Sequence, residues 1–436
     1  MSAMDFFSHP QADDLQQSSQ YQSLKGRLHR LLINIIEEEN VNLSDWSQDQ
    51  VRNYIETKIN FFIADQRLAI NRREAETLVT DMVDELLGFG PIQRLIEDDD
   101  VNDILVNGYA KVFVERRGRL LRTPLRFIDD AHVLRIIHRI LAPLGRRVDE
   151  ATPMVDARLP NGGRVNAIIG PLALDGPALS IRKFRREPLR AGDLLTYGTL
   201  NEPMLKLLRS AVRARCNLLI IGASGAGKTT LLNVLSEFIP GDERIVTIED
   251  AAELSLDHGH VVRLESRPPN LEGHGEVNMR ALVRNALRMR PDRIIVGEVR
   301  GPEMLDMLQA MSTGHEGSMG TLHANSPRDA LSRLEMLAGF AGYAGSEFTL
   351  RQQVGAAIDM IVQIGRLPSG ERRVLHVQEV TGIADNNYML QELFCYDFSR
   401  RDFVQMEVKP YSAKLQRLLQ DEEAQSGPFA TSRYVS

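Results

Sequence analysis

A chain of 436 residues is longer than a single hydrophobic core usually grows, so two or three domains are expected. Its 43% hydrophobic and 25% charged residues indicate a folded protein, and no stretch approaches the roughly 20 apolar residues that span a bilayer. The polar N-terminus lacks the apolar segment of a secretion signal, so we expect a cytoplasmic protein without a direct membrane span. A net charge of −7 disfavours a nucleic acid as the main partner.

Near the N-terminus, apolar residues recur at helical spacing in three segments, and a glycine–proline stretch at residues 88–91 ends the last of them. These segments predict a helical module over residues 1–88, with a disordered start. They cover residues 21–39, 48–66 and 72–87.

Strand and helix signals alternate over residues 89–187, which predicts an α/β domain of ordinary size. Residues 188–198 contain proline and glycine at few periodic positions, so we expect them to form a linker and the hinge between domains. The strand signals of the α/β domain lie at residues 104–106, 111–115, 164–169 and 179–184, and its helix at 131–144.

Beyond this linker, short apolar runs alternate with helical patterns, which predicts a second α/β domain over residues 199–410, built on a mostly parallel sheet. The tail, residues 411–436, is polar, and its last dozen or so residues are expected to be disordered. The apolar runs lie at residues 217–221, 244–248, 261–264, 294–296, 318–322 and 360–364.

Residues 222–229 read G-A-S-G-A-G-K-T, a complete phosphate-binding loop between an apolar run and a helical pattern. In that context backbone N–H groups at the start of the helix point towards phosphate oxygens. Lys228 is expected to reach the β- and γ-phosphates and Thr229 to bind Mg²⁺ through its hydroxyl. The residues expected to bind the nucleotide are Gly222, Ala223, Ser224, Gly225, Ala226, Gly227, Lys228, Thr229 and Thr230.

Carboxylates follow two of the predicted strands, where the carboxyl ends of parallel strands meet the phosphate loop. Glu298 follows one strand and is expected to orient the attacking water, although a solvated glutamate is the alternative interpretation. Many phosphate-loop enzymes have an aspartate where this chain has Gly297, so the metal must depend on Thr229 and on a carboxylate from elsewhere.

The second carboxylate group follows the strand at residues 244–248. Glu249 and Glu253 are candidates for the network of metal and water, with Glu249 binding Mg²⁺ directly or through water. Asp250 lies between them and fits the N-cap of a short helix equally well.

Two histidines bracket a glycine-rich strand, and their spacing is not that of zinc ligands on one helix face. His323 follows the strand and is expected to sense the γ-phosphate, and His315 is a weaker candidate for the same task. Hydrolysis is often accelerated by an arginine supplied in trans. Arg158 and Arg164 flank a turn, and Arg182 lies in an apolar context, so these three are candidates for that role.

Four motifs occur in a fixed order that resembles the secretion-superfamily ATPases of type II secretion, type IV pili and type IV secretion. They read G-A-S-G-A-G-K-T, T-I-E-D-A-A-E-L, R-I-I-V-G-E-V-R and G-H-E-G-S-M-G-T-L-H-A-N, at residues 222–229, 247–254, 293–300 and 314–325. Within this superfamily, residues 267–273, 285–292 and 325–335 are similar to the CpaF-type ATPases of the tight-adherence (Tad, or Flp) pilus.

The resemblance implies a RecA-like ATPase domain, a PAS-like N-terminal domain and a ring-shaped homohexamer that uses ATP and Mg²⁺. It gives Glu298 the Walker B role, places Glu249 and Glu253 in the Asp box, and puts the two histidines in the His box. The arginines at 158, 164 and 182 match those that approach the nucleotide from the N-terminal domain. A protein of this kind works at the inner face of the inner membrane on a platform protein, and assembles a pilus with or without retracting it.

Three other functions stay open from the sequence. The chain also fits a type IV or type II secretion ATPase, whose motifs are shared. A RecA-like nucleic-acid translocase is disfavoured by the acidic net charge and by the 6% aromatic content, which offers no stacking series. A scaffold that binds nucleotide without hydrolysing it is disfavoured by Lys228, Thr229, Glu298 and His323.

Overall fold

The computed structural model describes residues 19–116, 118–160, 162–183, 189–267, 269 and 274–426. Two compact units make up the chain, Met1–Arg186 and Glu187–Ser436, and each is described by itself. The segments predicted to be disordered at the start and at residues 427–436 lie outside the described residues.

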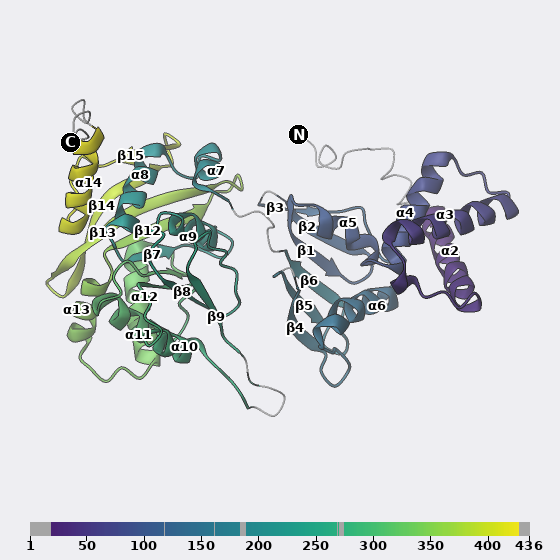
Figure 1. Cartoon of the computed structure of the whole chain (residues 1–436), viewed down its shortest axis with the longest axis horizontal. Helices are drawn as coiled ribbons and strands as arrows, with labels where there is room; N and C mark the ends of the chain where they lie inside the picture. The colour runs from purple at the N-terminus through teal and green to yellow at the C-terminus, as the bar shows by residue number, and fades with distance from the viewer. Residues whose placement is uncertain are drawn as a thin grey trace, which may run out of the picture. The chain divides into compact units, whose positions relative to one another are not determined.

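The first unit begins with a helical module, which we define as α2 (Ser19–Glu38), α3 (Gln48–Asp65) and α4 (Arg72–Leu86) (Figure 1). Capping boxes begin α3 and α4, because Ser47 pairs with Gln50 and Asn71 pairs with Glu74. A 3₁₀ turn, Leu43–Asp45, separates the first two helices. The apolar stripes of the three helices meet in one core that includes Leu28, Ile55, Ile59, Leu78 and Met82.

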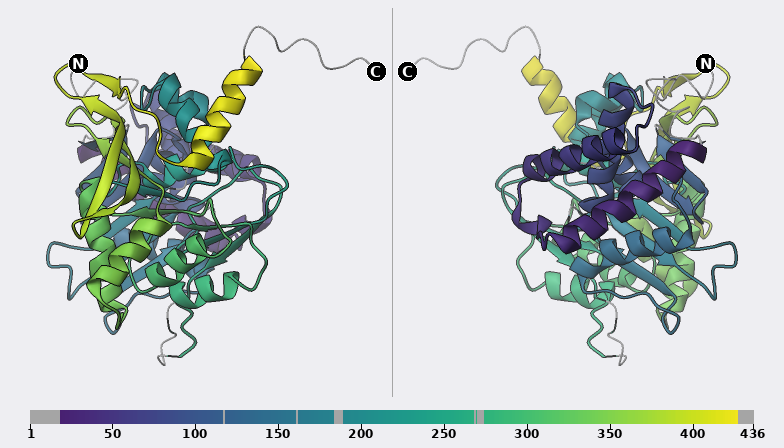
Figure 2. Two further views of the ribbon diagram at one scale, coloured as in Figure 1. Left: turned by 90° about the vertical axis from the view of Figure 1, so that its left-hand side faces the viewer. Right: turned by 90° about the vertical axis from the view of Figure 1, so that its right-hand side faces the viewer.

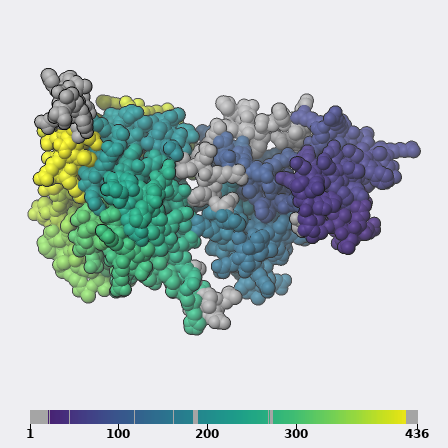
Figure 3. Space-filling view, in the orientation of Figure 1, coloured from purple at the N-terminus to yellow at the C-terminus, as the bar shows by residue number. Residues whose placement is uncertain are grey.

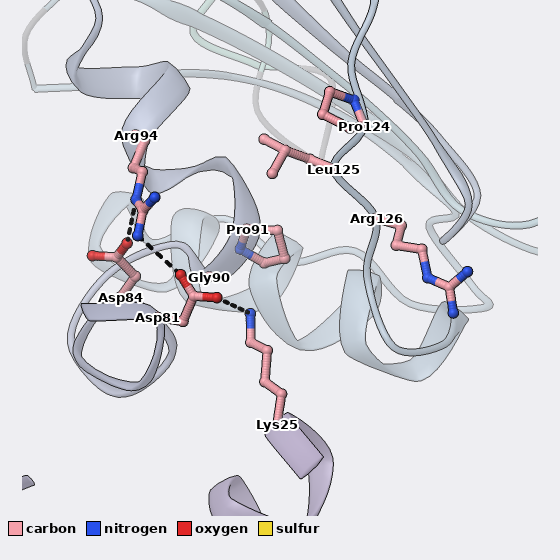
Figure 4. Close-up of a pocket in the computed structure, with 9 residues that line it drawn as sticks. All are labelled: Lys25, Asp81, Asp84, Gly90, Pro91, Arg94, Pro124, Leu125 and Arg126. Atoms are coloured by element: carbon pink, nitrogen blue, oxygen red, sulfur yellow. Dashed lines mark hydrogen bonds and ion pairs between the residues drawn. The ribbon is translucent and has the colours of Figure 1, made fainter. Parts of the chain in front are cut away.

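Buried charges join the helical module to a helix of the domain that follows. Lys25 Nζ lies 2.9 Å from Glu85 Oε1, and His132 Nε2 lies 2.8 Å from the other oxygen of Glu85. Figure 4 shows Lys25 and Arg94 on either side of Asp81, beside a pocket lined also by Arg126. Because these charges are buried, their pairing fixes how α2 lies on α4.

A six-stranded antiparallel sheet forms the rest of the first unit, in the order β3-β2-β1-β6-β5-β4. One face packs against α6 (Asp130–Leu141) through residues such as Ile104, Leu179 and Ile137, and the opposite face lacks such a helix among the described residues. The strands are β1 (Val101–Asn107), β2 (Lys111–Arg116), β3 (Arg119–Arg122), β4 (Met154–Arg158), β5 (Arg164–Ile168) and β6 (Ala178–Arg182). Short helical segments are η3 (Gly90–Ile92), α5 (Gln93–Glu97) and η4 (Ala142–Leu144).

The second unit is built on a nine-stranded sheet in the order β15-β14-β13-β12-β7-β11-β10-β8-β9. The strands from β12 to β9 run parallel, as predicted, and each predicted apolar run overlaps one of them. They are β7 (Leu218–Ile221), β8 (Ile245–Glu249), β9 (Val261–Glu265), β10 (Arg293–Val296), β11 (Met319–Leu322) and β12 (Met360–Arg366).

Helices cover both faces of this sheet, so that successive residues of β7 enter two separate cores (Figure 1). Leu218 and Ile220 face the side of α8 (Glu202–Arg213) and α9 (Lys228–Ser236). Leu219 and Ile221 face the other side. The helices on that side are α10 (Met279–Ala286), α11 (Glu303–Ser312), α12 (Pro327–Phe340) and α13 (Glu347–Ala357).

Four features of the second unit differ from the sequence-based expectations. The predicted linker contains α7 (Ala191–Thr196), because Asp193 caps it and Leu194 is buried in the unit's core. The polar tail forms α14 (Ala413–Ser426), which lies on α8 and is yellow in Figure 3. Asp250 caps no helix, since an irregular segment follows it. Strands that the sequence did not reveal, β13 (Arg372–Ala384), β14 (Asn387–Asp397) and β15 (Asp402–Gln405), extend the sheet with an antiparallel ribbon (Figure 2).

Candidate active site

The phosphate loop joins β7 to α9 at the carboxyl edge of the parallel strands. Gly222, Gly225 and Gly227 have φ angles of 155°, 68° and 100°, which other residues rarely adopt. A Cβ atom at Gly222 would also lie 2.2 Å from the carbonyl oxygen of Ile364 on the neighbouring strand. The loop therefore needs glycine at these positions, both for its turn and for its close approach to β12.

Lys228 starts α9 and is buried beneath the loop, with a relative exposure of 7%. Its Nζ donates to the carbonyl oxygens of Gly222 and Ala223, at 3.1 and 3.0 Å. Burial lowers the pKa of Lys228. The lysine is thus held by the loop that it serves, at the start of a helix whose free N–H groups favour an anion.

Glu298 lies beyond β10 between two basic side chains. Its Oε1 is 2.7 Å from His323 Nε2, and its Oε2 pairs with the guanidinium of Arg300. His323 also lies 3.4 Å from Lys228 Nζ, so the two meet beside the loop. Burial and the Lys228 charge lower the pKa of His323, although Glu298 opposes them, which favours the neutral imidazole. Sequence reasoning gave Arg300 no role, although it is the last residue of the motif at 293–300.

Glu249 supplies the carboxylate that Gly297 cannot. Its Oε1 accepts backbone N–H bonds from Glu253 and Leu254, each 2.8 Å long. Burial raises the pKa of Glu249 to about 7, against the lowering effect of those two bonds. Its Oε2 is buried without a hydrogen-bond partner among the described residues. Such an oxygen, at the same edge of the sheet as the phosphate loop, suits Mg²⁺ or a water bound to it, so the residues present fit the metal.

Glu253 contributes to the site through its backbone N–H group and through its charge. Its N–H group holds Glu249, and its charge acts electrostatically on both Lys228 and Arg300. Among the described residues, no cluster of three or more His, Cys, Asp or Glu side chains forms a ready-made metal site. The metal expected here therefore depends on Thr229, which is half-buried, on Glu249 and on the nucleotide itself.

His315 does not lie with the residues at the phosphate loop within the second unit. It precedes β11, whereas His323 follows it, and β11 runs parallel to β7. The two histidines therefore lie at opposite edges of the sheet, with His315 away from the phosphate loop. Its carbonyl oxygen accepts a hydrogen bond from Ser318 Oγ at 2.7 Å, which fixes the turn before β11.

The three predicted arginines belong to the first unit and form a row across its sheet. Arg158 lies opposite Arg164, and Arg164 lies opposite Arg182, so that their side chains leave the same face. This is the face without α6. Arg182 Nε is 3.1 Å from Asp103 Oδ1 on the next strand. A shallow pocket on the same face is lined by Asp103, Asp156, Arg164, Asn166, Ser180, Ile181 and Arg182.

Sequence reasoning also missed Arg372, at the start of β13. Its Nε donates to the carbonyl oxygen of Gly225 in the phosphate loop at 3.2 Å. No motif marks this residue, because a long separation in the sequence and an unpredicted strand bring it to the loop.

The fold and the site define a class of protein. A phosphate loop in a mostly parallel sheet, with Glu298, His323 and Glu249 at the same edge, is the arrangement of a phosphate-loop ATPase with a RecA-like fold. Gly297 stands where many phosphate-loop enzymes have an aspartate, and Glu298 at the next position supplies a carboxylate. This difference narrows the class of ATPase further.

The chain belongs to the family described as Type II/IV secretion system protein, which matches residues 85–427. It is 41% identical over 299 residues to a putative conjugal transfer protein of Mycobacterium tuberculosis, covering 67% of this chain and 84% of that protein. It is 34% identical over 311 residues to the type IV secretion system protein PtlH of Bordetella pertussis, covering 64% and 90%. The solved ATPase DotB of Legionella pneumophila is 21% identical, with a TM-score of 0.47 and coverage of 77% and 87%. The chain is an ATPase of this secretion superfamily.

Within the described residues, no helix has both the length and the apolar character needed to cross a membrane.

Proposed function

We propose that this ATPase is a cytoplasmic homohexameric motor, which hydrolyses ATP to assemble a Tad-type pilus through an inner-membrane platform protein. The observation that carries the motor proposal is the row of Arg158, Arg164 and Arg182 on an open sheet face. Like charges directly opposite one another destabilise a sheet. Arg182 pairs with Asp103, and we propose that this face also meets a triphosphate bound by a neighbouring subunit.

Different residues of the second unit have different roles in hydrolysis. Glu298 orients the attacking water and takes up its proton, while neutral His323 holds one carboxylate oxygen and Arg300 holds the other. Lys228 and the N–H groups of the loop stabilise charge on the phosphates. Thr229 and Glu249 would hold Mg²⁺, which neutralises charge on the β- and γ-phosphates when it is bound.

A motor follows if the arginine face and the phosphate loop are complementary only while triphosphate is bound. Binding would then favour closure of the two units, and hydrolysis would favour opening. Because α7 belongs to the core of the second unit, residues 191–196 are not part of the hinge that we propose within 188–198.

The Tad pilus is supported by residues 267–273, 285–292 and 325–335, which resemble the CpaF-type ATPases, and by the helical module that precedes the family match. The second candidate is a type IV secretion or conjugation motor. The names of the relatives from Mycobacterium tuberculosis and Bordetella pertussis favour it.

A strain in which Lys228→Ala replaces the wild-type residue distinguishes the two candidates. Loss of surface pili by electron microscopy, with normal plasmid transfer, supports the pilus motor. Loss of transfer or of protein export, with pili intact, supports the second candidate. Light scattering of the purified protein with ATP and Mg²⁺ tests the hexamer, and the absence of a six-subunit species would contradict it.

A further inference from the structure

Gln363 on β12 is the polar member of an otherwise apolar row at the carboxyl edge of the parallel strands. It lies directly opposite Ile221, the last residue of β7, and Ile221 lies opposite Leu322, the last residue of β11. Residues in register leave the same face of a sheet, so the three side chains point towards the core that contains Ile221 and Leu322. The phosphate loop follows Ile221 directly, and His323 follows Leu322. Gln363 therefore lies at the same edge as both.

The side chain of Gln363 holds the backbone two residues after His323. Its Nε2 donates to the carbonyl oxygen of Asn325 at 2.7 Å, so it joins β12 to the segment after β11, although β7 lies between these strands. The N–H group of Asn325 donates to Asp329 Oδ2, in the first turn of α12, at 2.9 Å. Two side chains thus fix residue 325, and with it the path of the segment that carries His323.

The amide of Gln363 is unfavourable for stability at this position. Gln363 is 8% exposed, and its Oε1 is buried without a hydrogen-bond partner in the part of the chain that the structure describes. Burial of an acceptor without a donor lowers stability, and the neighbours in the row, Ile221 and Leu322, are apolar. An apolar side chain of the same length would fit there without this penalty. What such a side chain cannot provide is the hydrogen bond to Asn325.

The contacts of His323 depend on the path of this segment. Its Nε2 lies 2.7 Å from Glu298 Oε1 and 3.4 Å from Lys228 Nζ. Hydrogen bonds weaken steeply with distance, so a shift of the segment by about 1 Å would break the contact with Glu298. A residue that fixes the segment therefore fixes the imidazole between the carboxylate and the lysine.

We infer that Gln363 is a positioning residue for ATP hydrolysis, which keeps His323 in place beside the phosphate loop through the backbone of Asn325. Gln363 can act in this way only if His323 takes part in hydrolysis, as we propose. Because it acts through His323, it contributes to the chemical step and not to nucleotide affinity.

Gln363→Met in the full-length protein tests this role, because methionine has nearly the same length and makes no such hydrogen bond. We expect kcat for ATP to fall about tenfold, as for loss of one hydrogen bond that the transition state needs. KM for ATP and the dissociation constant of fluorescent ADP should stay unchanged. The melting temperature should change little, because Asn325 is exposed and its carbonyl can bind water instead. Failure of the variant to fold, weaker ADP binding or an unchanged kcat would each contradict the inference.

A cycle with His323→Ala distinguishes positioning from a general effect on the fold. If Gln363 acts through His323, Gln363→Met should lower kcat no further when His323→Ala is already present. A further tenfold loss in that background would overturn the role of Gln363 and leave that of His323 intact. Hydrolysis by His323→Ala alone at the wild-type rate would instead remove the proposed role of His323, and that of Gln363 with it.

The matched control is Gln391→Met, which removes the same type of hydrogen bond from the antiparallel ribbon. Gln391 lies on β14, and its Nε2 donates to the carbonyl oxygen of Lys409 at 2.6 Å. Its kcat and KM should match those of the wild type. An equal fall of kcat in the two glutamine variants would show that the effect is not specific to the segment of His323, and the inference would then be wrong.

Discussion

Glu249 fills the space that a side chain at Gly297 would occupy. A Cβ atom built on Gly297 would lie 2.7 Å from Glu249 Cγ, closer than nonbonded carbon atoms approach. The two residues follow adjacent parallel strands, and the Gly297 N–H group donates to the Ile248 carbonyl at 2.9 Å. The missing Walker B aspartate is thus a consequence of packing, because the buried carboxylate comes from β8 instead of β10.

Restoring a side chain at residue 297 should therefore damage the protein. Gly297→Ala is expected to lower the free energy of unfolding by about 1–3 kcal/mol through overpacking, and Gly297→Asp to lower ATPase activity as well. Thermal melting and steady-state ATPase assays measure the two effects. Gly259→Ala is the control, since a Cβ atom there meets nothing within 4 Å. In the double variant with Glu249→Ala, part of the lost stability should return, and strictly additive losses would contradict this packing argument.

Glu249 should release a proton when Mg²⁺ binds. Its folded pKa is about 7, raised by burial from 4.5, so between these values the folded protein binds more protons than the unfolded chain. Stability without ligands should accordingly fall as pH rises through this window. Because Mg²⁺ favours the ionised carboxylate, calorimetry in buffers of different ionisation enthalpy should show proton release upon MgATP binding below about pH 7. Glu249→Gln should abolish both effects, and proton release that persists in it would assign the proton to another group.

Glu298→Gln should separate binding from hydrolysis. The amide retains the shape of the side chain and cannot take up the proton of the attacking water, so kcat should fall by about 100-fold or more. Binding of fluorescent ATP should change little, because Lys228 and the loop remain. Arg300→Ala is the comparison, since it removes a neighbour of the carboxylate and leaves the base in place. Hydrolysis by Glu298→Gln at the wild-type rate would remove the proposed mechanism.

The helical module should detach from its sheet when Glu85 is altered. Burial alone would raise the pKa of Glu85, but the His132 hydrogen bond and the Lys25 charge lower it to about 2. The stability due to this lowering is present above the unfolded pKa of 4.5 and is lost as pH falls towards 2. Glu85→Gln removes the nearer of two charged partners of buried Lys25 and leaves Asp81 at 3.9 Å, so we expect a cost of up to about 3–5 kcal/mol.

Limited proteolysis within α2 measures this detachment. The control, Glu76→Gln, changes an exposed glutamate of α4, the helix of Glu85, whose partner Arg72 is also exposed, and should leave cleavage unchanged. Protection of α2 in Glu85→Gln equal to that in the wild type would contradict the role of the buried pair.

The sequence predicted the parts of the site that local patterns encode. Apolar runs of three to five residues identified the parallel strands because both faces of that sheet are buried, and Glu298, His323 and Glu249 follow such runs. The long strands β13 and β14 were missed because their buried and half-buried positions form no continuous apolar run. Arg372 was missed with them. His315 was predicted to precede the strand at residues 318–322 and His323 to follow it, and the two ends of one strand lie at opposite edges of the sheet.

Mixing of inactive variants tests whether the arginines of one subunit complete the active site of its neighbour. Arg182→Ala and Lys228→Ala should each inactivate a hexamer by itself. If Arg182 acts across subunits, about a quarter of the sites in randomly mixed rings combine both intact residues, and activity should partly return. Arg158→Ala and Arg164→Ala should behave in the same way, because they share the row.

Two controls separate this exchange of residues from an effect on folding or assembly. Arg135→Ala removes an exposed arginine from α6, on the other side of the sheet, and should leave activity unchanged. Mixing Glu298→Gln with Lys228→Ala should restore no activity, since both residues serve the same subunit's site. Failure of all three arginine variants to recover activity with Lys228→Ala would confine the site to one subunit.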